Sequence, residues 1–366
     1  MDKKMYIIAS SALPEDIRVD DLTHLIIANA HIGLDFKITG RNSRLFAGYK
    51  GDIPTPGYLC CIPRDFWERI PRLKQQNPNL KVIVSIGGRG ADGFSDLADS
   101  AVTRKIFADS VSEYINKHNL DGIDIDWEYP TVQGRSYSKT RQEDRQNFTY
   151  LLADLKKTIG DKEISITVHT ANWYIESIEL IETTRYISCL HIKTHGFAST
   201  ADTETRHHTN LFAAENDPNP YAESADLGVA RYFDCGLPPE LLCITCAGYG
   251  IEFRGISRAA SNPILPGLFQ KYTHKEPHVW SHGIIPYNTL QDHYINKNDF
   301  KRFWDDHAKA PFLYSETEKT FITYEDEESV AVKMEYAEHN ELKGVCLWHY
   351  TDATKLWNKF KARSNN

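Results

Sequence analysis

The sequence lacks the long apolar run that a membrane-spanning helix requires. No window of its 366 residues approaches about 18 consecutive apolar positions. It also lacks an excess of basic residues, because 42 Lys and Arg face 50 Asp and Glu, for a net charge of −8. We therefore expect neither a nucleic acid nor a membrane as the main partner, and a neutral small molecule or polymer fits better.

A recognisable secretory leader is also missing. The chain starts with basic residues, but the apolar run that follows is short and reaches Glu15 too soon for a cleavable signal peptide. Three expectations stay open: the chain stays inside the cell, it is exported by a non-Sec route, or a leader was removed before residue 1. Extracellular action is compatible with the last two.

The seven cysteines are an odd number, so they cannot all form intramolecular disulfides. We expect mostly reduced, buried thiols. Cys243 and Cys246 form a CITC motif in a strand-like run, where positions three apart face opposite sides, so one ion could not easily reach both sulfurs. We predict no metal site and no cofactor, and we interpret the adjacent His207 and His208 as polar loop residues.

Strand-like runs recur along the chain, with helical patterns between most of them. The runs cover 5–10, 23–30, 81–88, 120–130, 163–170, 186–193, 241–248 and 344–350. The helical patterns cover 65–76, 102–118, 141–159, 176–184, 222–235, 328–340 and 353–362. This βα alternation predicts an α/β fold over residues 1–366, a (β/α)8 TIM barrel.

One connection breaks this rhythm. From Tyr249 to Asp326 the chain is far longer than the usual ~2–6 residues of a βα loop, and it is rich in Tyr, Trp, Phe and Pro. We predict a small inserted α+β subdomain over 251–326, after the seventh strand. Connections that follow strands emerge at the catalytic end of a barrel, so the insertion should form one wall of the cleft.

The segment 120–130, LDGIDIDWEYP, alternates acids with apolar residues. The period of two is typical of a strand and places the carboxyl groups of Asp124, Asp126 and Glu128 on one face. Inside a barrel they would step up toward the mouth, with Glu128 highest. Clustered carboxylates disfavour each other's ionisation, so some should hold protons at neutral pH. A protonated Glu at a cleft mouth, above an anion, favours glycoside hydrolysis.

Two other interpretations compete for the same acids. The D-x-D-x-E spacing resembles the start of an EF-hand calcium loop, but that loop needs polar spacers and Gly at its sixth position, where Tyr129 stands. The acids could also be a structural cluster neutralised by Lys or Arg. Three acids inside a barrel are, however, costly to keep for structure alone.

DGIDIDWEYP resembles the signature of glycoside hydrolase family 18, the chitinases and chitinase-like proteins. The resemblance extends over most of the chain: SIGG at 85–88 is similar to the third-strand motif, and GIIPY at 283–287 resembles the end of the family's inserted subdomain. It implies a TIM barrel and a carbohydrate substrate, with N-acetylglucosamine polymers linked β-1,4 as the substrate class.

The resemblance also implies roles for the three acids. Glu128 matches the proton donor, Asp126 the residue that orients the acetamido group of the substrate, and Asp124 the acid that shares a proton with Asp126. The implied mechanism is retaining and substrate-assisted, with no protein nucleophile.

Aromatic residues are carried over in the same way. Trp348 matches the eighth-strand Trp beneath the −1 sugar, Tyr249 an aromatic near that sugar, and Tyr129 a cleft-lining Tyr. Trp173, after the fifth strand, could replace one of the stacking surfaces that this chain lacks.

The sixth strand departs from the family pattern. Ile192 stands where a Tyr would bind the acetamide carbonyl, and Lys193 replaces an Asp, which reverses a charge. A cation close to Glu128 would lower its pKa, so we expect activity at more acidic pH. Alternatively, Lys193 could bind a carboxylate of an acidic amino sugar.

Two functional hypotheses follow from these residues. The first is a glycosidase that cleaves chitin or chitin-like glycans. The second is a catalytically weak or inactive chitinase-like lectin, or a subunit of a larger assembly, and the sixth-strand changes motivate it. Because the chain keeps Glu128, the enzyme is favoured.

Overall fold

The computed structural model describes residues 1–9, 17–40, 62–134, 138–256, 264–273 and 283–357. The chain divides into two compact units. The N-terminal unit comprises Asp2–His191 and Cys235–Cys243, and the C-terminal unit comprises Met1, Ile192–Asp234 and Ile244–Asn366.

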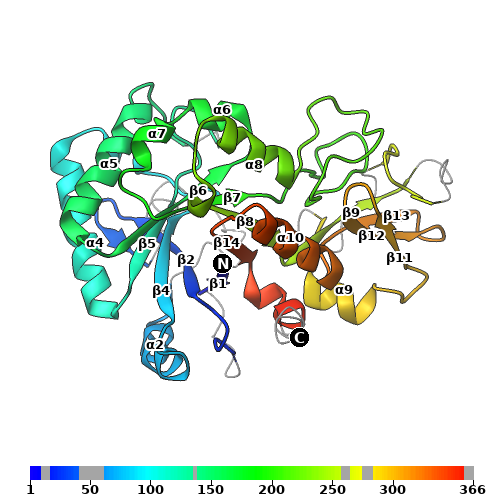
Figure 1. Ribbon diagram of the computed structural model, residues 1–366, viewed down its shortest axis with the longest axis horizontal. Helices are drawn as coiled ribbons and strands as arrows, with labels where there is room; N and C mark the ends of the chain where they lie inside the picture. The colour runs from blue at the N-terminus through cyan, green and yellow to red at the C-terminus, as the bar shows by residue number, and fades with distance from the viewer. Residues whose placement is uncertain (10–16, 41–61, 135–137, 257–263, 274–282, 358–366) are drawn as a thin grey trace, which may run out of the picture. The chain divides into compact units, whose positions relative to one another are not determined.

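The larger sheet has the strand order β1-β14-β8-β7-β6-β5-β4-β2-β3, and β1 also pairs with β2 (Figure 1). This pairing closes eight strands into a (β/α)8 TIM barrel, which confirms the predicted fold. The eight barrel strands are β1 Asp2–Ile8, β2 His24–Ile32, β4 Lys81–Gly87, β5 Gly122–Asp126, β6 Glu163–His169, β7 Cys189–Lys193, β8 Leu242–Ala247 and β14 Gly344–Trp348. β3 (Ile38–Thr39) is a two-residue antiparallel addition to β2.

Helices of the N-terminal unit alternate with these strands along the chain. They are α2 Arg64–Gln76, α3 Phe94–Ala98, α4 Ala101–His118, α5 Asp144–Ile159, α6 Asn172–Glu176 and α7 Leu180–Thr183, with a 3₁₀ turn η2 at Pro239–Leu241. The side chain of Ser100 caps α4 by accepting a hydrogen bond from the Thr103 amide. α5 stops at Gly160, the predicted end, where φ is 62° and few other residues fit.

The C-terminal unit contains α8 Ala225–Asp234, α9 Tyr287–His293, α10 Glu327–His339 and a 3₁₀ turn η4 at Tyr350–Asp352. Asp326 and Ser329 form a reciprocal capping box at the start of α10. Lys333 of α10 and Glu325 form a fully buried ion pair. Both oxygens of Glu325 also accept hydrogen bonds, from Thr209 and Ser329, so the buried charges are well satisfied.

A second, five-stranded antiparallel sheet lies in the same unit, with the order β10-β9-β13-β12-β11. Its strands are β9 Tyr249–Arg254, β10 Ile284–Pro286, β11 Lys301–Asp305, β12 Ala310–Ser315 and β13 Thr320–Thr323. Phe253, Phe312 and Phe321 form the centre of its apolar core. These strands fall in the long connection after the seventh barrel strand, and the delimitation of a subdomain at 251–326 stays a prediction.

Some sequence predictions fall partly on residues outside the described ranges. These include the end of the helix expected at 353–362, parts of 251–326, and Cys60 and Cys61. The other cysteines form no disulfide among the described residues, in line with the prediction of mostly reduced, buried thiols, and all but Cys235 are buried: Cys189, Cys235, Cys243, Cys246 and Cys346.

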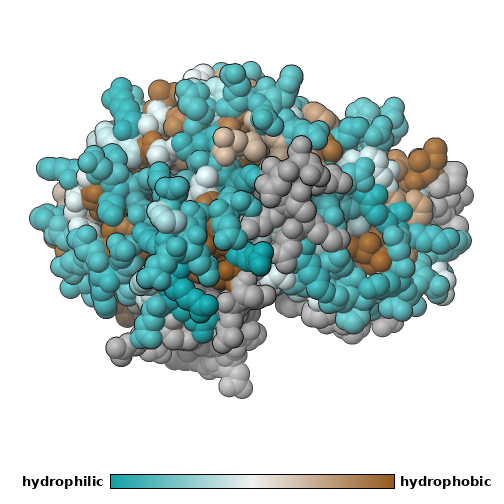
Figure 2. All heavy atoms as spheres, turned by 60° about the horizontal axis from the view of Figure 1, so that its bottom comes forward, coloured by the Kyte–Doolittle hydropathy of each residue, from teal (hydrophilic) through white to brown (hydrophobic). Residues whose placement is uncertain are grey.

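The surface is predominantly polar on the face shown in Figure 2, where apolar side chains form small separate patches. Large apolar side chains with high exposure, such as Val102, Tyr221 and Ile264, come from distant parts of the sequence. Among the described residues, no helix is both long and apolar enough to cross a bilayer.

Candidate active site

The lower half of the acidic strand β5 is a closed hydrogen-bonded cluster around Asp124, which has no exposed surface. Its carboxylate accepts hydrogen bonds from Ser85 (2.8 Å), Ser165 (2.8 Å), Thr167 (3.0 Å) and Tyr6 (3.1 Å). The sheet register explains the serines, because Asp124 lies directly between Ser85 of β4 and Ser165 of β6. The short hydroxyl side chains therefore satisfy a carboxylate that water cannot reach.

His191 of β7 completes this cluster. Its Nδ1 atom lies 3.3 Å from Oδ1 of Asp124 and 2.9 Å from the Tyr6 hydroxyl. Burial alone would raise the pKa of Asp124, but the hydrogen bond and charge of His191, and then the serine hydroxyls, hold it at about 2. Burial would lower the pKa of His191, whereas the charge of Cys189 and the hydrogen bond to Asp124 raise it to about 9.

We predicted that some of the clustered acids hold protons and that an anion lies below Glu128. His191 favours the ionised form of Asp124, so Asp124 fits the place of that anion. The cation that neutralises Asp124 is a histidine, not the Lys or Arg of the structural alternative. His191 lies 67 positions further along the chain, and only the inward alternation of the sixth strand could have signalled it.

The SIGG motif holds the upper end of β5. Asp126, the last residue of β5, is 5% exposed, and its backbone oxygen accepts a hydrogen bond of 2.8 Å from the Gly88 amide. Gly87 has a φ of 114°, and a Cβ atom there would lie 2.2 Å from the same oxygen. Gly87 is therefore required both by its backbone conformation and by the close approach of the two strands.

Glu128 and Tyr129 follow β5 and are half-buried. The Tyr129 ring packs edge-on against Trp173 of α6, with 4.9 Å between ring centroids, and against His169 at 6.2 Å. Trp173 is 39% exposed. The structure thus brings together Tyr129 and Trp173, both predicted site residues, and Glu128 directly precedes Tyr129 in the chain. The motif search missed His169, which the alternation of Ser165, Thr167 and His169 along β6 could have indicated.

The other predicted site residues belong to the C-terminal unit. Lys193 ends β7, Tyr249 begins β9 and Trp348 ends β14, and all three are half-buried. Lys193 and Trp348 thus occupy the carboxyl ends of barrel strands, where active-site residues of this fold are found. Ile192, by contrast, has no exposed surface.

His207 and His208 lie in a loop, as interpreted, but their side chains are buried. Nε2 of His207 lies 3.1 Å from Oδ2 of Asp305. The His208 ring packs against Tyr249, with 5.0 Å between the ring centroids, and burial holds the pKa of His208 well below its usual value. His208 is therefore a neutral packing partner of Tyr249.

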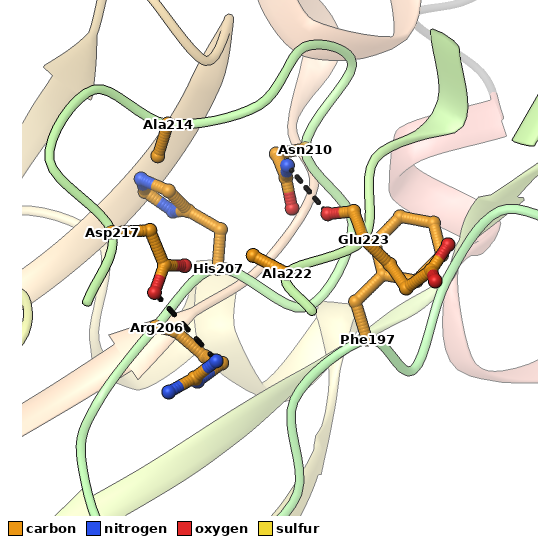
Figure 3. Close-up of a pocket in the computed structure, with 8 residues that line it drawn as sticks. All are labelled: Phe197, Arg206, His207, Asn210, Ala214, Asp217, Ala222 and Glu223. Atoms are coloured by element: carbon orange, nitrogen blue, oxygen red, sulfur yellow. Dashed lines mark hydrogen bonds and ion pairs between the residues drawn. The ribbon is translucent and has the colours of Figure 1, made fainter. Parts of the chain in front are cut away.

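A small polar pocket lies in the segment between β7 and α8 (Figure 3). An ion pair of 3.7 Å joins Arg206 to Asp217 across it, and the Asn210 side chain donates a hydrogen bond of 3.0 Å to the backbone oxygen of Glu223. None of the predicted site residues is among its lining residues, which are Phe197, Arg206, His207, Asn210, Ala214, Asp217, Ala222 and Glu223. Since none of the predicted site residues lines it, we assign the pocket no role in the proposed chemistry.

The family model for glycosyl hydrolases family 18 matches residues 4–353. Chitinase A1 of Niallia circulans is 32% identical, over 87% of this chain and 46% of the relative. Probable chitinase 2 of Drosophila melanogaster is 28% identical, over 77% of this chain and 58% of the relative. This chain therefore spans about half the length of these relatives.

Solved structures give the same result. Chitinase ChiW of Paenibacillus sp. str. FPU-7 superposes with a TM-score of 0.87 and 34% identity, over 99% of this chain and 42% of that one. A family 18 N-acetylglucosaminidase of Paenibacillus barengoltzii superposes with a TM-score of 0.80 and 28% identity, over 98% of this chain and 99% of that one. The matches confirm the resemblance seen in the acidic motif, and the chain belongs to glycosyl hydrolases family 18, a family of glycosidases.

Proposed function

We propose that this chain hydrolyses β-1,4-linked N-acetylglucosamine polymers, with Glu128 as the proton donor. The observation that carries the proposal is the position of Glu128. Its half-buried carboxyl group follows the carboxyl end of β5, where substrate sites of this fold lie, and its neighbour Tyr129 packs against the exposed Trp173.

The chemistry assigned to these residues is retaining and assisted by the substrate. Glu128 protonates the leaving glycosidic oxygen while the carbonyl oxygen of the substrate's N-acetyl group attacks C1. Asp126 orients the acetamido group and stabilises the positive charge that develops on its nitrogen. Water then opens the cyclic oxazolinium ion, and Glu128 takes back a proton, so no protein nucleophile is needed.

Asp124 supports this chemistry from below without meeting the substrate. Because hydroxyl groups from three strands hold its oxygens, its carboxylate cannot rotate freely. A fixed negative charge beneath Asp126 favours positive charge at the reacting centre.

Aromatic side chains provide the sugar-binding surfaces in this proposal. Trp173 and Tyr129 offer a stacking surface beside Glu128, and the family resemblance adds Tyr249 and Trp348. Relatives named chitinases support a chitin-like substrate. The N-acetylglucosaminidase, which this chain matches over 99% of that chain's length, supports the release of single sugars as a second mode of action.

Three fluorogenic substrates distinguish these modes: the aryl glycosides of N-acetylglucosamine, of its β-1,4 dimer and of its trimer. Preferred release from the dimer or trimer supports a chitinase, and preferred release from the monomer supports an N-acetylglucosaminidase. Glu128→Gln should strongly lower release, whereas Glu176→Gln, an exposed glutamate on α6, should leave it unchanged.

The lectin or assembly-subunit alternative gives a different result. In that case wild type releases no fluorophore from any of the three substrates, yet binds chitin oligosaccharides measurably by calorimetry. Such an outcome would overturn the hydrolase proposal while leaving the family assignment intact.

Lys193 tests the role assigned to the sixth strand. If its ammonium group acts on the proton donor, the alkaline limb of the pH–rate profile, where the donor loses its proton, should move to higher pH in Lys193→Asp. Identical profiles for wild type and variant would reject this role, and faster turnover of acidic than of neutral amino sugars would favour the carboxylate-binding alternative.

A further inference from the structure

Two cysteine sulfurs and one histidine nitrogen lie close together in the interior of the N-terminal unit. Cys189 and His191 come from β7 and Cys243 from β8, and each side chain is fully buried. The two sulfur atoms and one nitrogen of His191 all lie within 4.8 Å of one another. From sequence we considered Cys243 only with Cys246, rejected that pair as a metal site and predicted none; Cys189, which lies near Cys243, belongs to another strand.

The orientation of His191 is that of a metal ligand. Its Nδ1 atom engages the Asp124 carboxylate at 3.3 Å and the Tyr6 hydroxyl at 2.9 Å. Its Nε2 atom is buried and makes no hydrogen bond to any described oxygen or nitrogen atom. Metal-bound histidines almost always donate one ring N–H to a carboxylate and use the other nitrogen for the metal, and Asp124 supplies that carboxylate here.

We propose that Cys189, Cys243 and His191 form a metal site of the Cys2His type for Zn²⁺. Thiolate and imidazole are the ligands that Zn²⁺ prefers, and a tetrahedral zinc site needs ligand atoms about 3.5–4 Å apart. The three ligand atoms lie within 4.8 Å of one another, so shifts of about 1 Å would bring them to the spacing that the ion needs. Because the three side chains have no solvent exposure, the ion enters while the chain folds.

The local charges suit a divalent ion. Binding Zn²⁺ displaces the thiol protons of Cys189 and Cys243 to solvent, and His191 binds through the Nε2 lone pair while Nδ1 keeps its hydrogen. The ion and two thiolates then sum to zero. Lys4, which is 2% exposed and interacts electrostatically with Cys189 and His191, forms an ion pair of 3.5 Å with Asp2. A buried group of charges without a net charge avoids the largest desolvation cost.

Metal analysis of the full chain tests the site. The protein is produced with added zinc, purified without chelators and analysed for Zn, Cu and Fe by mass spectrometry. We expect about one Zn per chain, with two cysteine sulfurs and one histidine nitrogen among its ligands. Cys189→Ser and Cys243→Ser should each lose most of the metal. The matched control Cys246→Ser, which replaces another buried thiol of β8, should keep it.

Zinc-edge X-ray absorption on wild type gives a result that does not depend on the variants folding. Two sulfur ligands and at least one imidazole nitrogen in the first shell are expected. Chains without metal, Cu or Fe in place of Zn, a first shell without sulfur, or a Cys189–Cys243 disulfide in the purified protein would each overturn the proposal. Neither measurement uses glycoside hydrolysis, so the site can fail while the proposed activity stands, or the reverse.

Discussion

The two ends of the acidic motif on β5 carry the same chemical group in opposite environments. Asp124 has no exposed surface, and its oxygens accept hydrogen bonds from four hydroxyl groups and meet His191. Glu128, two residues beyond the end of the strand, is half-buried and follows the carboxyl end where substrates bind. One alternating stretch of sequence thus supplies both a buried carboxylate, Asp124, and a partly exposed carboxyl group, Glu128.

The difference shows why repulsion among neighbouring acids does not decide their protonation here. Hydrogen bonds and the charge of His191 outweigh the burial of Asp124, so its ionised form is favoured. An acid that must give and regain a proton needs access to the reacting atoms. The five tests below ask whether the two ends can be changed independently.

The largest expected effect is on turnover at the open end. Glu128→Gln should lower kcat by about 10²–10⁴-fold, because general acid catalysis is lost. Its melting temperature should stay close to that of wild type, because the side chain is half-buried and lies outside the cluster around Asp124. A large drop in melting temperature would mean that Glu128 is structural and would remove the contrast between the two ends.

The largest effect on the free energy of unfolding should come from a change at Asp124, the buried end of the acidic motif. Asp124→Asn leaves the buried His191 without its anionic partner and should lower the free energy of unfolding by about 3–5 kcal/mol, measured in urea. Asp161→Asn, an exposed aspartate before β6, is the control and should change stability by less than about 0.5 kcal/mol. Equal effects of the two substitutions would argue against a role for the buried pair.

Gly87 tests the contact that fixes the upper end of β5. Gly87→Ala should cost about 1–3 kcal/mol in unfolding free energy, because its Cβ atom would lie 2.2 Å from the Asp126 oxygen. Gly236→Ala is a matched control, since Gly236 also has a positive φ, of 83°, but open space around its Cα. If the two variants lose the same stability, backbone strain alone explains Gly87.

The lower rim of the barrel predicts a pH dependence of stability. Burial opposes ionisation of Glu163, but hydrogen bonds and charges from His24 and Lys81 hold its pKa at about 2, below its ordinary 4.5. Because the folded-state pKa is the lower one, the stabilisation is present above pH 4.5 and is lost as pH falls toward 2.

The free energy of unfolding of wild type should therefore exceed that of Glu163→Gln by about 1–2 kcal/mol near neutral pH. This value allows for the screening of the half-exposed Lys81 by solvent. The difference should vanish near pH 2. Denaturation in urea at several pH values measures it, and a difference that is independent of pH would contradict the assignment.

The smallest expected effect concerns the aromatic surface. Trp173→Ala should raise KM for chitin oligosaccharides about fivefold, equivalent to about 1 kcal/mol of stacking, with kcat nearly unchanged. Tyr221→Ala, which removes an aromatic side chain that is 85% exposed, serves as control and should leave KM as it is. An unchanged KM in Trp173→Ala would exclude Trp173 from the sugar-binding surface.

Much of the fold could be predicted from sequence because the barrel strands are apolar, regularly spaced and separated by amphipathic helices. The predicted helix at 176–184 was less accurate: the structure has α6 at Asn172–Glu176 and α7 at Leu180–Thr183 instead. Helices of four or five residues are too short to show a 3.6-residue period. The two-residue β3 was missed for the same reason.

The candidate site was predictable where it depended on one strand and not where it depended on several. Alternation within β5 placed Asp124 and Asp126 in the interior correctly. The partners of Asp124 come from β1, β4, β6 and β7, and no local pattern links His191 or Tyr6 to it. His207 and His208 do lie in a loop, but no local pattern shows that packing against Asp305 and Tyr249 buries them.

If Glu128 supplies the proton to the leaving group, the Glu128→Gln variant should respond differently to leaving groups that need protonation and to leaving groups that do not. We predict that the variant loses about 10²–10⁴-fold in kcat/KM on chitotetraose, whose sugar leaving group needs protonation. On a dinitrophenyl chitobioside, whose leaving group departs without a proton, it should lose less than about tenfold. An equal loss on both substrates would contradict the account.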